Sequence, residues 1–203
     1  PICSYAKWLH KALETYRVPK ELVKRGFPSR LKRIFRDEEE LPASADLSSC
    51  INNALEQSRF LIVICSPRII NSIWCDEEVK KFRQLQRHNQ IIALLIEGEP
   101  RDSFLPSLCE IRKTVLQNGS KIEEIEKVEP LAADVRAQRE ESPRELKHLA
   151  KLRILACILG CSFDDLRKRE QKRRQQKALQ IITLLSCLLI SFSFLTIWAL
   201  RES

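Results

Sequence analysis

The sequence contains no methionine and opens with proline, so we expect it to be a fragment of a longer chain. Its four glycines are too widely spaced to form a G-x-G-x-x-G dinucleotide loop or a Walker A phosphate loop. It also lacks the G-x-S-x-G turn that carries the nucleophile of α/β-hydrolases. These absences argue against Rossmann-type redox chemistry, P-loop nucleotide hydrolysis and serine hydrolase chemistry.

Metal-ligand patterns are missing as well. The three histidines, His10, His88 and His148, are scattered, and the eight cysteines show neither a C-x-x-C pair nor a repeated spacing. Two cysteines, Cys65 and Cys187, lie within apolar runs, where a thiol acts as a small hydrophobic group. We therefore predict no metal site and no disulfide framework, and a reducing cytosol suits the N-terminal part of the chain.

Positive charge is concentrated in one short segment. The net charge is +8, and Arg167–Lys177 alone holds seven Lys/Arg residues against one Glu. A basic segment directly before an apolar run is typical of a membrane boundary. We therefore expect a membrane, and no nucleic acid, as the partner of this segment.

The apolar run that follows, Ala178–Leu200, has 23 residues and no charge. At about 1.5 Å per residue it spans roughly 35 Å, enough for a hydrocarbon core of about 30 Å. A buried core helix of this length rarely lacks a polar face, and Trp198 sits where interfacial aromatic residues are common. We predict a single transmembrane helix, with the N-terminal domain kept in the cytoplasm by the basic segment before it.

A strand followed by a helix forms the centre of the predicted domain. Phe60–Cys65 is an unbroken apolar run, as expected of a strand covered on both faces, and Ser66-Pro67 ends it. Apolar residues then recur at helical spacing from Trp74, with Asn71 or Ser72 as the helix cap. Glu78 follows Trp74 by four residues, so the two share one helix face at the carboxyl end of a buried strand. That is where parallel sheets bind ligands.

The remaining pattern predicts an α/β domain with a parallel sheet covered by helices on both faces. The expected elements are a partly exposed strand over Leu31–Phe35, a helix after Asp46 with Leu47, Ile51, Ala54 and Leu55 facing inward, a buried strand over Ile91–Ile96, a partly ordered excursion over Arg101–Val128 and a helix from Pro143 that Gly160 ends. We place the domain at residues 1–160, a basic juxtamembrane helix at 161–177 and the transmembrane helix at 178–200.

The buried strand, Ser-Pro and Trp74-Cys75-Asp76-Glu77-Glu78-Val79 together resemble the Toll/interleukin-1 receptor (TIR) domain, in its membrane-anchored bacterial form. Phe35–Pro42 is similar to the family's BB loop, and Pro1–Tyr5 is similar to the end of its first strand, with a helix from Ala6. The resemblance implies a further edge strand over Glu129–Asp134. The resemblance covers about Pro1–Leu159 and implies a flavodoxin-like fold.

The resemblance also implies a site. In TIR domains that cleave NAD, the glutamate of this motif is catalytic, which assigns Glu78, while Trp74 stacks on the nicotinamide. Phe35 and Asp37 line the closing loop. NAD is then a substrate, and no cofactor is expected. From composition alone, Glu78 is instead an acid favoured by the helix dipole, the role that we assign to Asp76 and Glu77.

Two functions follow, and a third alternative remains. The first is hydrolysis of the nicotinamide–ribose bond of NAD, gated by assembly, which the Trp74/Glu78 pair favours. The second is a non-catalytic adaptor that pairs with other TIR domains, which the short connection after Tyr5 favours. Self-association would bring the basic Arg17–Arg36 segment of one copy against the acidic Asp37–Glu40 loop of another. The third is a truncated product without function.

Overall fold

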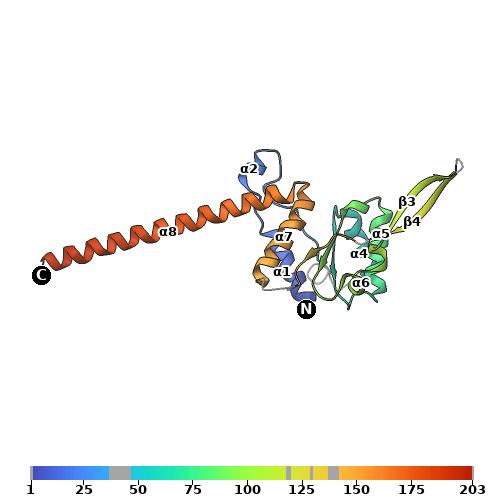
Figure 1. Cartoon of the computed structure of the whole chain (residues 1–203), viewed down its shortest axis with the longest axis horizontal. Helices are drawn as coiled ribbons and strands as arrows, with labels where there is room; N and C mark the ends of the chain where they lie inside the picture. The colour runs from blue at the N-terminus through green and yellow to red at the C-terminus, as the bar shows by residue number, and fades with distance from the viewer. Residues whose placement is uncertain (1, 37–46, 118–119, 129, 137–141, 203) are drawn as a thin grey trace. The chain divides into compact units, whose positions relative to one another are not determined.

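A parallel three-stranded sheet forms the centre of the N-terminal unit in the computed structural model (Figure 1), which describes residues 2–36, 47–117, 120–128, 130–136 and 142–202. The chain divides into two compact units, Pro1–Gly160 and Cys161–Ser203. The strands are β1 (Leu61–Cys65), β2 (Ile91–Leu95) and β5 (Ala133–Asp134), in the order β1-β2-β5. The predicted strands at all three places are confirmed, and β2 pairs in parallel with both neighbours.

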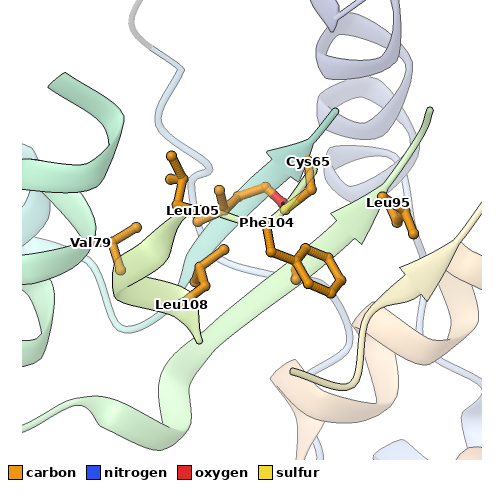
Figure 2. Packing of buried hydrophobic residues seen from close by; sticks show 8 residues of the cluster. Cys65, Val79, Leu95, Phe104, Leu105 and Leu108 are labelled. Carbon is orange, nitrogen blue, oxygen red and sulfur yellow. Dashed lines mark hydrogen bonds between the residues drawn. The ribbon is translucent and has the colours of Figure 1, made fainter. Parts of the chain in front are cut away.

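One face of the sheet is covered by α5 (Ile73–Gln84), by the short helix α6 (Pro100–Ser103) with Phe104 and Leu105 after it, and by the 3₁₀ turn η2 (Pro106–Leu108). Figure 2 shows Val79, Phe104, Leu105 and Leu108 gathered against Cys65 of β1 and Leu95 of β2. The side chains in this cluster are almost completely buried. Cys65 and Leu95 are register partners on neighbouring parallel strands, so their side chains point to the same face of the sheet.

The opposite face is covered by α1 (Ile2–Glu14) and α7 (Pro143–Leu159). Helix α1 contacts β1, whereas α7 contacts β2, β5 and α1. The buried Leu94 of β2 alternates with the residues of the first cluster and so belongs to this second face. Gly160 adopts a left-handed conformation with φ of 69° and ends α7 as predicted. The predicted parallel sheet with helices on both faces is therefore correct.

The predicted strand end at Pro1–Tyr5 is wrong, because α1 already begins at Ile2. Tyr5 lies one turn before Trp8, and their rings meet edge to face at 6.4 Å. The ammonium group of Lys147 in α7 lies 4.7 Å from the Tyr5 ring centre and 5.5 Å from that of Trp8. This packing against α7 uses Tyr5 in a helical position, which a strand would not offer.

The predicted strand at Leu31–Phe35 is also wrong. After α2 (Lys20–Val23), the chain makes one isolated bridge, between Arg17 and Arg30, and continues to residue 36 without a ladder. The backbone carbonyl of Ile34 is instead held by the side chain of His10 in α1, at 3.1 Å. Alternating apolar and basic residues mark a strand only where a neighbouring strand can pair with them.

The excursion predicted over Arg101–Val128 proves to be largely regular structure. Beyond α6 and η2, it contains an antiparallel hairpin of β3 (Glu110–Gln117) and β4 (Ser120–Lys127), which projects from the unit as a two-stranded ribbon (Figure 1). The register pairs Gln117 with Ser120, so two residues, Asn118 and Gly119, connect the strands. Asn-Gly is a strong sequence signal for a two-residue hairpin turn.

The second unit is dominated by one helix, α8 (Phe163–Glu202), of 40 residues. By length and composition, the part from Phe163 to Phe192 is long and apolar enough to cross a membrane. Its hydroxyl groups at Thr183, Ser186 and Ser191 each donate to a backbone carbonyl three or four residues earlier, at 2.8–2.9 Å. Hydroxyl groups satisfied in this way do not need water, which suits a helix in an apolar environment.

Candidate functional site

The candidate site begins at the carboxyl end of β1, where a short loop leads into α5. The loop is tightly bonded: the Ile69 amide donates to the Ser66 carbonyl at 3.0 Å, and the Ser72 amide donates to the Ile69 carbonyl at 2.8 Å. The Ser72 hydroxyl then accepts from the Cys75 amide at 3.4 Å, which makes Ser72 the helix cap, one of the two predicted. The first turn of α5 is thus fixed to the end of β1.

Helix α5 presents an exposed aromatic residue beside a half-buried acid. Val79 and Phe82 face the core and are 1% and 0% exposed, whereas Trp74 is 73% exposed. Glu78 lies one turn after Trp74 and is only partly exposed. Since successive helical residues are about 100° apart, Trp74 and Glu78 lie along the same edge of α5, next to its buried face.

That edge of α5 is the one that faces α4 (Leu47–Gln57). The ammonium group of Lys81 donates to Asn52 at 2.7 Å, and Arg87 donates to the carbonyls of Glu56 and Ser58 at 2.9 and 2.5 Å. The earlier residue, Lys81, meets the earlier Asn52, and the later Arg87 meets the later Glu56 and Ser58. The two helices therefore run in the same direction. The start of α4 therefore lies at the same end of the pair as Trp74 and Glu78.

Of the two residues predicted to line the closing loop, Phe35 and Asp37, only Phe35 lies within the described residues. Phe35 is 39% exposed and follows Ile34, whose carbonyl is bound to His10 of α1. Asp37 lies outside the described residues. The segment that contains Asp37 leads in sequence directly into α4, whose first turn lies at the Trp74/Glu78 end of the helix pair. The structure brings together Trp74 and Glu78, and the roles of all four residues stay predictions.

The opposite edge of α5 is occupied by Asp76. Its carboxylate accepts from the Ser107 amide at 3.0 Å, from the Ser107 hydroxyl and, at 2.6 Å, from the ammonium group of Lys80. Burial alone would raise the pKa of Asp76, but the hydrogen bonds from Lys80 and Ser107 outweigh it and hold that pKa below its usual value. Asp76 therefore fastens α5 to η2, a role beyond the helix dipole that the sequence predicted.

A second polar group supports the carboxyl edge of the sheet. Arg136, just after β5, forms hydrogen bonds with both carboxylate oxygens of Asp134 and donates to the Gly98 carbonyl at 2.6 Å. Its guanidinium also lies 3.3 Å from the Glu99 carboxylate. Arg136 was not among the residues predicted from the sequence, although an arginine two residues after an edge-strand aspartate has the reach for such a bidentate pair.

Metal binding and cysteine chemistry find little support in the described residues. No group of three or more His, Cys, Asp or Glu side chains within them is arranged to hold a metal ion. All eight cysteines lie within the described residues, and none of them forms a disulfide. Burial raises the pKa of the Cys65 thiol to about 12, so this cysteine is not a nucleophile at neutral pH.

Comparisons with known proteins agree with the motif. A family model described as the TIR domain matches residues 4–128. The chain is 26% identical over 172 residues to a protein named NAD(+) hydrolase ApTIR from Actinoplanes sp.. The alignment covers 79% of this chain and 24% of that protein, so the chain spans about a quarter of the length of the curated relative it matches. No solved structure matches the chain significantly.

Proposed function

Because this chain belongs to the TIR-domain family, we propose that it is a membrane-held TIR signalling protein that hydrolyses the nicotinamide–ribose bond of NAD. The observation that carries the proposal is the pairing of Trp74 and Glu78 on one edge of α5, at the carboxyl end of β1. A relative named as an NAD(+) hydrolase supports the same activity. In this proposal NAD is the substrate, and no further cofactor takes part.

The chemistry assigns a distinct role to each residue. Breaking the nicotinamide–ribose bond develops positive oxocarbenium charge on the ribose, which the carboxylate of Glu78 would stabilise. The exposed indole of Trp74 offers a flat surface for the nicotinamide ring. Phe35 and Asp37 would line the loop that closes over the nucleotide. TIR domains commonly self-associate, so a second copy would complete the site and assembly would control its activity.

A second candidate function is a non-catalytic adaptor that recruits other TIR domains. The observation that favours it is the exposed apolar pair at the start of α5, where Ile73 and Trp74 are 72% and 73% exposed. Side chains of this size are also what a protein partner would cover. The two candidates differ in whether Glu78 is needed, and this difference can be measured.

The test compares nicotinamide release by the full chain, clustered in lipid nanodiscs, for the unaltered protein, Glu78→Gln and Glu77→Gln. Glu78→Gln keeps the shape of the side chain but removes the charge, and it should lower the rate by about a hundredfold or more. Glu77 is exposed and lies on another side of α5, so Glu77→Gln should stay within about twofold.

Unchanged cleavage by Glu78→Gln would refute the catalytic assignment. If even the clustered, unaltered protein releases no nicotinamide while still binding TIR partners, the adaptor function would replace the enzymatic one.

A further inference from the structure

The basic segment of α8 divides into paired and exposed residues. Arg169 forms an ion pair with Asp165 at 2.9 Å, and Arg173 forms one with Glu170 at 3.4 Å. The other five basic residues are exposed and take part in neither of these pairs: Arg167, Lys168, Lys172, Arg174 and Lys177. Five positive charges therefore remain for a partner outside the helix.

These charges lie on the same uninterrupted helix as the apolar run that begins at Ala178. With a rise of about 1.5 Å per residue, Lys177 lies about 1.5 Å and Arg174 about 6 Å before the start of that run. Lys168 and Arg167 lie about 15 and 17 Å before it. The exposed basic residues therefore form a membrane-proximal pair and a distal pair, with Lys172 between them.

Distance decides which of these charges a membrane surface attracts. At physiological salt the Debye length is about 8 Å, so the proximal pair lies within one screening length of the apolar boundary and the distal pair about two lengths away. Near the surface, each Lys or Arg strengthens the attraction to an anionic leaflet by about fivefold. At twice the screening length most of this gain is lost.

The angular distribution of the charges also favours lipid over nucleic acid. At about 100° per residue, Lys172 and Arg174 point to nearly opposite sides of the helix, and Lys177 lies about 60° from Arg174, so the three charges are not confined to one side. Lipid headgroups surround a spanning helix on all sides and match this distribution. A nucleic acid would contact the charges on one side only.

We infer that Lys172, Arg174 and Lys177 of α8 bind the headgroups of anionic lipids in the leaflet where the apolar run begins. The inference rests on the proposed membrane span and adds a lipid preference to it. Anionic lipid should therefore be enriched around this chain relative to zwitterionic lipid, and the enrichment should depend on the proximal charges.

The experiment uses the full chain reconstituted in vesicles of phosphatidylcholine and phosphatidylglycerol. Electron paramagnetic resonance of spin-labelled lipids gives the relative association of each lipid with the protein. The proximal variant is Arg174→Gln with Lys177→Gln, and the matched distal variant is Arg167→Gln with Lys168→Gln. Each variant loses one exposed arginine and one exposed lysine, so both change the net charge equally.

We expect the unaltered protein to prefer phosphatidylglycerol severalfold, and added salt to weaken that preference. The proximal variant should lose most of this preference, whereas the distal variant should keep it within about twofold. Equal losses in the two variants, or no preference in the unaltered protein, would overturn the inference.

A separate readout distinguishes failure of the span itself. Alkaline carbonate should leave all three proteins in the vesicles, because the apolar run is unchanged in each. Extraction of the unaltered protein would refute the membrane span, and the lipid inference with it. Retention without lipid preference would refute the lipid inference alone. Capture of duplex DNA through the same basic residues at physiological salt, with loss of the lipid preference, would assign the segment to nucleic acid instead.

Discussion

At the scale of single residues, the three consecutive acids of α5 differ because the helix turns each one in a different direction. Asp76 points to η2 and is held by Ser107 and Lys80, while Glu78 lies on the α4 edge beside Trp74. Glu77, between them, is exposed. A run of similar side chains thus separates into a structural contact, a surface charge and a candidate catalytic group.

We predict that Asp76→Asn lowers the free energy of unfolding by about 1–2 kcal/mol at pH 7, since it removes the charge that Ser107 and Lys80 bind. The pKa of Asp76 is lowered in the folded state, so its contribution is complete above the unfolded value of about 3.9 and is lost as the pH falls through the folded pKa. Urea unfolding of the full chain in detergent, followed from pH 7 to pH 3, measures both effects.

Glu77→Gln is the control for this experiment, because Glu77 is exposed and Ser107 donates to Asp76 instead. It should change the stability by less than about 0.5 kcal/mol. A difference between Asp76→Asn and the unaltered protein that stays constant at every pH would contradict the role given to the Asp76 charge.

At the scale of elements, Gly98 lets the loop after β2 pack against the loop after β1. Its φ is +77°, and a Cβ placed on it would lie 2.4 Å from Pro67 Cγ and 2.5 Å from the Ser103 hydroxyl oxygen. The same glycine offers its carbonyl to Arg136. Gly98 therefore occupies a position at the carboxyl edge of the sheet, next to the candidate site, that has no room for a side chain.

We predict that Gly98→Ala lowers the free energy of unfolding by about 2–4 kcal/mol, from backbone strain together with the clash against Pro67. Gly160→Ala is the matched control, since its φ is also positive at +69° but nothing lies within 4 Å of the added Cβ. It should cost only the strain of about 1–2 kcal/mol. Equal losses in the two variants, by thermal unfolding, would show that the close packing at Gly98 contributes nothing.

The sequence predicted those elements whose burial leaves a pattern. The unbroken apolar runs gave β1 and β2, and the Ser72 cap and the stop at Gly160 gave the start of α5 and the end of α7. The hairpin of β3 and β4 was missed, although Asn118-Gly119 between two runs of eight residues is a turn signal. The strand expected at Leu31–Phe35 failed because pairing depends on a distant neighbour, which a local pattern does not contain.

The candidate site was predictable to a similar degree. The i, i+4 spacing places Trp74 and Glu78 together in any helix, so the sequence sufficed for that pair. The direction of α4 relative to α5 depends on Lys81 and Arg87 reaching residues about 30 positions earlier, which no local pattern reveals. For the same reason, the anchoring of Asp76 by Ser107, 31 residues away, became evident only in the fold.

At the scale of the whole molecule, we predict that the TIR domain is cytoplasmic and that the end of the apolar run lies across the membrane. Seven Lys/Arg residues at Arg167–Lys177 precede the run, and only Arg201 follows it within the sequence. Basic residues beside a span stay on the cytoplasmic side. Ser203→Cys, in a chain whose native cysteines are replaced by serine, should react with a membrane-impermeant maleimide in intact cells.

A cysteine in place of Lys7, on the exposed side of α1, is the control and should react only after the cells are permeabilised. The reverse pattern, with Ser203→Cys protected until permeabilisation, would contradict this orientation.

The continuity of α8 has a mechanical consequence. Between Phe163 and Glu202 the helix contains neither proline nor glycine, the residues at which helices usually kink. Such a helix is stiff along its whole length. A rotation of its apolar part therefore turns the basic part through the same angle. One residue inserted at the junction would rotate the two parts by about 100° and separate them by about 1.5 Å. An insertion of seven residues would nearly restore the angle while lengthening the helix by about 10 Å. Comparing the two insertions separates the effect of rotation from the effect of distance.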